Sequence, residues 1–230
     1  MNRPARKEAL QGARDVTPLA IGVAVYGMAF GLLAAQAGMS SLEVGFMSAF
    51  VFAGSSQIVA VERIMAGAGA LAAIVAGLAL NLRLVLVTAS IRDVYANRPF
   101  WQLLAGAHLT TDENWALMLA RRARRGTGGY AYLVGAGLVL MAVWTASTVL
   151  GVVFASALPE PRALGMDFAF VAAFIAIVRA LWRGKADLGP WLTSAAVVVA
   201  AVASGLVDSS WGIILGGLAG ASFAGVSRHV

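Results

Sequence analysis

The chain of 230 residues contains no cysteine and only two histidines, His108 and His229. Without cysteine, a disulfide, a thiol nucleophile and a thiolate-bound metal are all excluded. Two histidines so far apart also disfavour a zinc site built only from protein ligands. We therefore expect neither a metal nor a cofactor.

Charged residues are scarce as well. They make up 12% of this chain, whereas a soluble domain carries about 25%. Hydrophobic residues make up 60% of the chain, and the mean hydropathy is +0.82. Long apolar runs such as residues 133–158 produce this balance. The composition predicts an all-α polytopic membrane protein, folded as a single transmembrane domain over residues 1–230 and embedded in the lipid bilayer.

The net charge of +6 does not indicate a nucleic-acid partner, because the basic residues stand at the edges of apolar runs. Residues 1–16 are polar and basic, so we expect a cytoplasmic N-terminal segment without a cleaved signal peptide. Four arginines within residues 121–125 mark the cytoplasmic side most strongly, and Arg92 and Arg98 are the exception to the pattern. Both termini are expected in the cytoplasm.

We expect about seven to eight membrane segments. They cover approximately residues 17–38, 43–61, 64–91, 100–120, 130–157, 164–182, 191–207 and 211–226. The fourth is polar, and is either a marginal span that lines a cavity or one arm of a re-entrant hairpin. Glu62 and Arg63 end the second segment, which suits the cytoplasmic side. A weak echo between residues 46–50 and 168–172 is compatible with an internal inverted repeat, as in many secondary transporters.

Two polar stretches interrupt the apolar runs, at residues 52–57 and 80–83. A straight helix over residues 64–91 would be roughly 42 Å long at 1.5 Å per residue, longer than the hydrocarbon core of about 30 Å. Asn81 and Arg83 also lie about 200° apart on a continuous helix, so they do not share a face. We therefore expect broken or re-entrant helices near residues 54–57 and 81–83.

These interruptions are the predicted substrate site, because lipid would expel their polar side chains unless they face a shared cavity. The expected substrate-binding residues are Gly54, Ser55, Ser56, Gln57, Asn81 and Arg83. A substrate carboxylate would suit the start of a half-helix at Gly54. Alternatively, the serines bond back to their own helical turn, and Asn81 caps a broken helix.

Arg83 has two possible partners, a substrate carboxylate or one of three acidic side chains. These side chains, Asp112, Glu113 and Asp167, are also the candidates for proton coupling. Burial raises a carboxyl pKa and a neighbouring arginine lowers it, so a carboxyl group that moves between such settings can load and release a proton. His108 is within one helical turn of two of them, and is either a further titrating group or a packing residue.

The polar motifs together resemble those of the AzlC/YgaZ family, the large subunits of bacterial branched-chain amino acid exporters. The resemblance extends from about Val16 to Trp182. It rests on Gly54-Ser55-Ser56-Gln57, Leu80-Asn81-Leu82-Arg83, Thr111-Asp112-Glu113 and Met166-Asp167-Phe168-Ala169. It implies export of valine-like neutral amino acids across the bacterial inner membrane, driven by the proton gradient, with a small AzlD-like membrane subunit as partner.

Two other functions remain open on the residues alone. The same polar belt could line the pore of a passive channel. Asp112 and Asp167 could form the aspartyl pair of an intramembrane enzyme, although no serine–histidine or metal-ligand constellation accompanies them. An ATP-driven pump is disfavoured because the sequence has no Walker A motif. We expect a transporter and not an enzyme.

Overall fold

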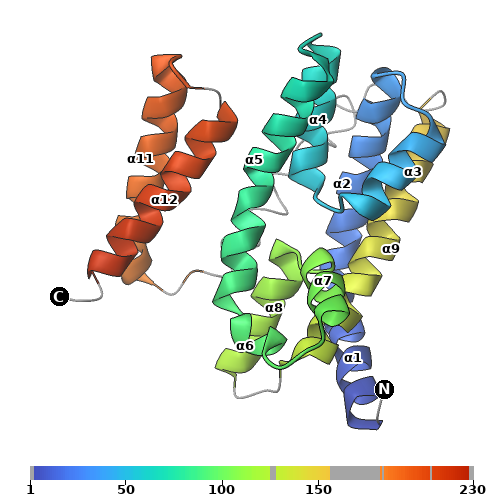
Figure 1. Cartoon of the computed structure of the whole chain (residues 1–230), viewed down its shortest axis with the longest axis vertical. Coiled ribbons are helices and arrows are strands. Elements are labelled where there is room, and N and C mark those ends of the chain that lie inside the picture. Colours follow the sequence, from blue (N-terminus) through green and yellow to red (C-terminus); the bar gives the residue numbers. More distant parts are fainter. Residues whose placement is uncertain (1–2, 125–127, 156–181, 183, 208, 228–230) are drawn as a thin grey trace.

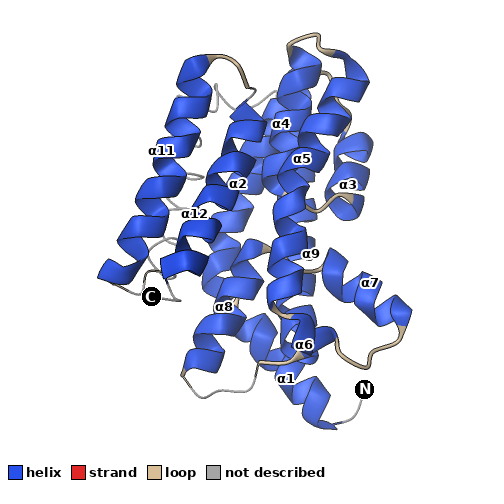
Figure 2. Ribbon diagram, turned by 60° about the vertical axis from the view of Figure 1, so that its left-hand side comes forward, coloured by secondary structure: helices blue, strands red, loops and turns tan. Residues whose placement is uncertain are grey.

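The computed structural model describes residues 3–124, 128–155, 182, 184–207 and 209–227, and every regular element in these ranges is a helix (Figure 2). The predicted all-helical class is therefore confirmed. Residues 164–181 of the expected sixth segment, Asp167 among them, lie outside the described ranges. The internal repeat and the total of seven to eight segments stay predictions.

Four helices in the described ranges are long and apolar enough to cross a membrane. They are α2 (Thr17–Gln36), α5 (Gly69–Ser90), α9 (Tyr130–Phe154) and the helical stretch Lys185–Ser204, which contains α11 (Leu188–Ser204). Helix α12 (Ser209–Ser227) packs against α11 and α5, so the last two helices form a hairpin beside the rest of the molecule (Figure 1). Helix α1 (Arg3–Asp15) is charged and lies against the first turns of α9.

Helices α2 and α9 are the closest-packed pair, and they run in the same direction. Gly27 of α2 lies against Ser147 of α9, and one turn later Gly31 lies against Thr148 and Gly151. Neither glycine leaves room for a Cβ atom, because that atom would overlap the facing helix. The small residues thus let two backbones approach closely, as in many membrane helix pairs.

A first re-entrant hairpin consists of α3 (Ser41–Phe50) and α4 (Gly54–Met65). Helix α3 begins at a capping box, in which Ser40 and Glu43 satisfy each other's backbone N–H groups. It ends just before Phe52, whose φ of 42° lies in the left-handed region and reverses the chain. The predicted break near residues 54–57 is therefore confirmed, and it falls immediately before Gly54.

Both ends of this hairpin lie at the same end of the molecule. Gly45 of α3 is beside Val149 of α9, and Gly54 is beside the earlier residue Trp144, so α3 runs opposite to α9. Helix α4 then runs back antiparallel to α5 (Figure 1). The expected second span over residues 43–61 is therefore a hairpin, because α3 with 10 residues and α4 with 12 are each too short to cross a bilayer of about 30 Å, and the cytoplasmic placement of Glu62 and Arg63 stays a prediction.

The predicted break at residues 81–83 is also wrong, because α5 is one continuous helix from Gly69 to Ser90. Gly67 and Gly69 have positive φ angles and place residues 66–68 in a turn. The remaining 22 residues extend roughly 33 Å, which matches the hydrocarbon core without a break. Asn81 and Arg83 need no unwinding because each finds a partner on the first turn of α4.

A second re-entrant hairpin enters from the opposite end, after the short helix α6 (Arg92–Tyr95). It consists of α7 (Phe100–His108) and α8 (Asp112–Ala123), so the hairpin is the correct one of the two alternatives for residues 100–120. The tips of the two hairpins meet where Nε2 of His108 lies 2.9 Å from the carbonyl oxygen of Ala49. His108 thus connects the two hairpin tips with an exposed side chain.

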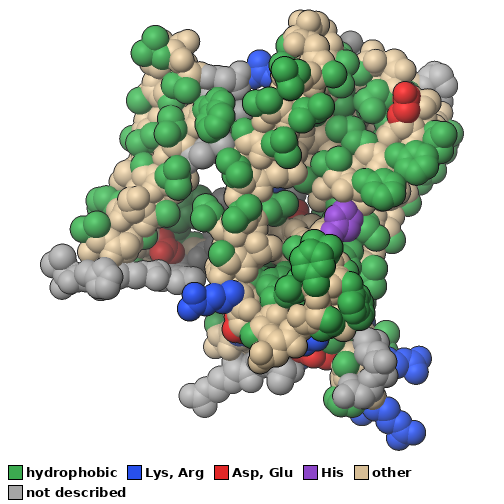
Figure 3. All heavy atoms as spheres, viewed as in Figure 1, with side chains coloured by type: hydrophobic (Ala, Val, Ile, Leu, Met, Phe, Trp, Pro, Cys, Tyr) green, Lys and Arg blue, Asp and Glu red, His purple; other side chains and the backbone are tan. Residues whose placement is uncertain are grey.

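The second hairpin also explains why Arg92 and Arg98 do not fit the charge pattern expected from the sequence. Asp93 of α6 pairs with Arg122 of α8, and Arg121 pairs with Asp15 of α1, so these segments gather at one end of the molecule. Arg92, the first residue of α6, and Arg98, three residues after its end, belong to the same end. Figure 3 shows blue side chains gathered at the lower end. The charge distribution fits a cytoplasmic face there.

Candidate functional site

A cavity of about 50 Å³ lies between the tips of the two hairpins, and α2, α5 and α9 close its sides. It has room for roughly three or four waters at about 10–15 Å³ each. Its lining residues are Val23, Tyr26, Phe52, Ala53, Gly54, Ser55, Arg83, Leu84, Thr110, Thr111, Asp112, Glu113, Leu140 and Trp144. The predicted cavity between the polar stretches therefore exists, and the second hairpin contributes to it as well.

Two helices begin at this cavity from opposite sides of the molecule. Helix α4 begins at Gly54 and α8 at Asp112, and the first two residues of each helix line the cavity. Thr111 caps α8 in a capping box with Asn114, whose side chain also donates to the carbonyl of Leu109 at 2.7 Å. The free N–H groups and the positive dipole ends of both helices favour an anion between them.

Arg83 joins the two hairpins across the cavity. Its Nη1 lies 3.1 Å from Oδ2 of Asp112, and its Nη2 donates to the hydroxyl of Ser55 at 2.8 Å. Among the described residues, the buried Nε of Arg83 has no hydrogen-bond partner. The Arg83 side chain is 35% exposed and that of Asp112 20%. This is the structural ion pair, one of the two alternatives that the sequence left open. The Nε–H group of Arg83 remains available as a hydrogen-bond donor.

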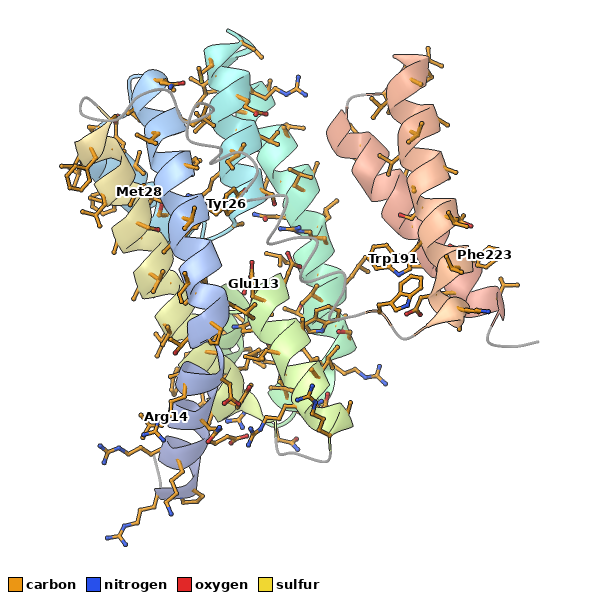
Figure 4. All side chains as sticks on the ribbon, turned by 180° about the vertical axis from the view of Figure 1, so that it is seen from behind. Arg14, Tyr26, Met28, Glu113, Trp191 and Phe223 are labelled. Atoms are coloured by element: carbon orange, nitrogen blue, oxygen red, sulfur yellow. The ribbon has the colours of Figure 1, made fainter. Side chains whose placement is uncertain are left out.

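Glu113 is the second carboxylate at the cavity. It follows Asp112 in the first turn of α8, and both residues line the same space. Figure 4 shows Glu113 at the upper end of α8, below Tyr26 of α2. No ion pair involves Glu113 in the described part of the chain, whereas Asp112 is held by Arg83. Two neighbouring carboxylates therefore have different surroundings, which is a common basis for separate roles.

Three of the predicted ligands lie outside the cavity. Ser56 is buried, and its hydroxyl donates to Oδ1 of Asn81 at 2.7 Å, so these two residues pin α4 to α5. Asn81 is in the middle of a continuous helix and caps nothing. Gln57 is 0% exposed and faces α9, where its Oε1 accepts a hydrogen bond from Nε1 of Trp144 at 2.9 Å.

The apolar wall of the cavity comes from α2 and α9 and was not predicted. Trp144 is its largest member; its ring stacks on Phe30 with centroids 5.7 Å apart and lies 5.3 Å from the ring of Tyr26. Leu140, one turn earlier on α9, lines the same wall. An indole N–H in the middle of an apolar run needs a buried partner, and this feature could have marked Trp144 in the sequence.

The groups that line the cavity are hydrogen-bond donors, carboxylates and apolar side chains. Across the described ranges, no group of three or more histidine, aspartate or glutamate side chains could hold a metal ion. Arg83, Ser55 and the start of α4 provide donors, Asp112 and Glu113 at the start of α8 provide carboxylates, and Leu140 and Trp144 provide an apolar wall. Such a space suits a small zwitterion with an apolar side chain.

The sequence is similar to those of known membrane proteins. The chain matches the family described as "AzlC protein" over residues 18–158, which include every described residue of the cavity. It is 29% identical to the inner membrane protein YgaZ of Escherichia coli K12 over 185 residues, 78% of this chain and 75% of YgaZ. An uncharacterized membrane protein of Helicobacter pylori J99 is 28% identical over 195 residues, 83% of this chain and 85% of its own length.

A second Helicobacter pylori membrane protein, from strain 26695, is 26% identical over 213 residues, 90% of this chain and 91% of its own. No solved structure matches the fold. All three relatives are named as membrane proteins, and the matches cover 75–91% of their lengths. The family match covers more than half of the sequence, so the chain belongs to the AzlC family.

Proposed function

We propose that this protein is a secondary transporter that exports neutral, branched-chain amino acids of the valine type. Membership of the AzlC family and the membrane-spanning helices support a role in membrane transport. The observation that carries the proposal is the cavity between two hairpins that enter from opposite ends of the molecule. Discontinuous helices that meet at mid-membrane around a small polar site are typical of secondary transporters.

The two kinds of wall fit the two parts of the substrate. A carboxylate would lie at the start of α4, where Ser55 and the Nε of Arg83 offer donors. The ammonium group would then face Asp112 and Glu113, and the apolar side chain would lie against Leu140 and Trp144. One arginine and two carboxylates give the site a net charge of −1, so a zwitterionic substrate leaves one negative charge, which a bound proton would neutralise.

Proton coupling would use Asp112 and Glu113. A substrate carboxylate that takes over Arg83 releases Asp112, which is then free to bind the ammonium group or a proton. Export against a gradient thus depends on a competition between two carboxylates for one guanidinium. Asp167, the third predicted coupling residue, lies outside the described residues, so its part in this cycle remains a proposal from the sequence.

A small AzlD-like membrane subunit is proposed as the partner. Several helices present apolar side chains to the outside, as Leu71 and Leu78 of α5 do at 76% and 62% exposure. Lipid covers such faces by default, so the subunit is proposed from the family resemblance. Transport should therefore be measured both with and without it.

The test is counterflow in liposomes loaded with unlabelled valine, with labelled valine outside. We expect uptake well above that of empty liposomes, and loss of uptake in Arg83→Ala. Arg92→Ala is the matched control, because Arg92 is an arginine outside the cavity. Uptake no greater than in empty liposomes, with the partner present, would refute transport of valine, and a large single-molecule current would indicate a channel.

Coupling is tested in the same liposomes. Asp112→Asn together with Glu113→Gln should abolish uptake driven by a pH gradient, while valine exchange continues with weaker affinity because the neutral side chains still accept hydrogen bonds from the ammonium group. Loss of exchange at saturating valine would show that the carboxylates are needed for binding or for the structure and not only for proton coupling.

A further inference from the structure

Gln57 looks like a ligand in the sequence but lies behind the cavity wall. It is in the first turns of α4, three residues after Gly54, and its side chain faces α9 instead of the cavity. Of the two side chains that hydrogen-bond to the Gln57 amide, Ser48 and Trp144, Trp144 lines the cavity and Ser48 does not. The Gln57 side chain is therefore connected to a substrate through that ring.

A buried chain of hydrogen bonds fixes both side chains. Trp144 Nε1 donates to Oε1 of Gln57 at 2.9 Å, and Nε2 of Gln57 donates to the hydroxyl of Ser48 at 3.5 Å. Ser48 lies 2.9 Å from the hydroxyl of Thr148, which donates to the carbonyl of Thr145 at 3.0 Å. An indole nitrogen can only donate and a carbonyl can only accept. Each hydrogen bond in this series therefore has only one possible donor, and the Gln57 amide has only one possible orientation.

This series of hydrogen bonds links three helices to the Trp144 ring. Ser48 belongs to α3, Gln57 to α4, and Trp144 and Thr148 to α9. All four side chains are at most 3% exposed, so water cannot replace a lost partner easily. The indole also packs against two other rings: Phe30 stacks on it, and the tilted ring of Tyr26 lies 5.3 Å from it. The ring is thus held in one place while it forms part of the cavity surface.

The held ring limits the space opposite the charged groups. A Cβ atom on Gly54 would lie only 2.9 Å from Cη2 of Trp144, so the indole reaches the start of α4. The cavity has a volume of about 50 Å³. A ring that is smaller or free to tilt would admit a larger side chain at that end, without any change at Arg83 or Asp112.

We propose that Trp144 determines the size of the amino acid side chain that the site accepts, and that Gln57 is the positioning residue that holds its ring. The inference rests on the proposed amino acid transport and adds the basis of its selectivity. It assigns to Gln57 a role different from that of a direct ligand. The two roles predict different results, because loss of a direct ligand weakens all substrates alike, whereas a displaced wall changes their ratio.

The experiment compares counterflow of alanine, valine and phenylalanine by wild type, Trp144→Phe and Gln57→Met. In Trp144→Phe the ratio of phenylalanine to valine uptake should rise about tenfold, the usual scale for pocket-size discrimination. Gln57→Met keeps the length of the side chain but removes the acceptor, and should shift the ratio in the same direction by a smaller factor. Alanine uptake should change least, because alanine does not reach the wall.

Ser56→Ala is the matched control. Ser56 is the neighbour of Gln57 and donates a buried hydrogen bond of its own, but to Asn81 and away from Trp144. Its ratio should equal that of wild type. The double variant Gln57→Met/Trp144→Phe removes both partners of the buried bond together, which is milder than leaving one unpaired, and should retain the altered ratio if a single variant fails to insert.

The outcomes separate this inference from the proposed function. No exchange of any amino acid by wild type would defeat the transport proposal itself. Exchange by wild type, with equal loss for all three substrates in Gln57→Met, would overturn the positioning role. An unchanged ratio in Trp144→Phe would overturn the role of the ring.

Discussion

Arg83 and Asp112 form an ion pair of 3.1 Å that joins α5 to the tip of the second hairpin, while the same guanidinium holds Ser55 at the tip of the first. One side chain therefore connects both hairpins across the cavity. A transporter that opens alternately to its two sides has to rearrange this contact. The pair is thus a structural link, and in the proposed function it is also the point where a substrate carboxylate competes.

The pair should show strong energetic coupling. Asp112→Asn leaves a cation unpaired, and Arg83→Met leaves a carboxylate unpaired. Both side chains are partly exposed, so each single variant should lose about 1–3 kcal/mol, less than the ~3–5 kcal/mol of a fully buried pair. The double variant should be more stable than the sum of the two losses predicts. Thermal unfolding in detergent measures this, and strictly additive losses would show that the pair contributes no interaction of its own.

Gly54 should be sensitive to a single added methyl group. In Gly54→Ala the new Cβ would lie 2.9 Å from Cη2 of Trp144 and 3.0 Å from Cε1 of Tyr26, so the aromatic wall must move. We expect a loss of about 1–3 kcal/mol, as for other overpacked sites, together with reduced counterflow.

Gly77→Ala is the control for that variant. Gly77 lies inside α5, and its added Cβ would meet the carbonyl oxygen of Ser56 at an ordinary 3.5 Å. Alanine is the better helix former by about 0.5–1 kcal/mol. Gly77→Ala should therefore leave stability unchanged or raise it, and a loss equal to that of Gly54→Ala would contradict the steric explanation.

Much of the cavity was predictable from the sequence because charge and polarity are costly in lipid. Arg83, Asp112 and Ser55 had to be paired somewhere in the interior, and they are found together. The start of α4 was visible for a similar reason, since Gly54 follows an apolar run and precedes three hydrogen-bonding residues. A polar side chain buried without a partner costs free energy, so each of these residues predicts a polar partner close to it.

The direction of the helices was not predictable in the same way. Apolar composition shows that residues lie in the membrane, but not whether the chain crosses it or turns back. The turn at Phe52 depends on one left-handed residue, and a non-glycine residue gives no warning of that conformation. Likewise, the continuous path of α5 past Asn81 depends on Ser56, 25 positions away. Tertiary contacts determine both the turn at Phe52 and the continuous path of α5.

At the basic end, Asp15 should matter more than Asp93. Asp15 accepts from Arg121 at 3.1 Å, from the hydroxyl of Tyr132 at 2.9 Å and from Gln11 at 2.7 Å. It therefore connects α1 with α8 and α9. Asp15→Asn should cost about 1–3 kcal/mol, because hydrogen bonds to a charged group are strong.

Asp93→Asn is the comparison, since Asp93 has a single pair with Arg122 at 2.9 Å and is 62% exposed. An exposed pair contributes about 0–1 kcal/mol. The hydrogen bond from Arg122 lowers the pKa of Asp93. Any stabilisation is therefore present above the ordinary carboxyl pKa and is lost as the pH falls through the lowered value. Melting curves at neutral and acid pH should show a small difference from wild type that disappears in acid; a difference that grew in acid would have the wrong sign.

The re-entrant path of α3 and α4 can be tested directly because the natural chain has no cysteine. Single cysteines at Gln36, Ala68 and Ala123 would occupy exposed positions at the end of α2, between α4 and α5, and at the end of α8. A membrane-impermeant thiol reagent added to intact cells should label Gln36→Cys and Ala68→Cys, and should label Ala123→Cys only after the cells are opened.

A full crossing by residues 43–61 predicts a different pattern, because Ala68 would then share the side of Ala123. The three positions thus decide between a crossing and a hairpin without reference to transport. Labelling of Ala68→Cys only in opened cells would contradict the re-entrant path of α3 and α4. The cavity would then lose its basis as well, because the start of α4 would no longer face the start of α8.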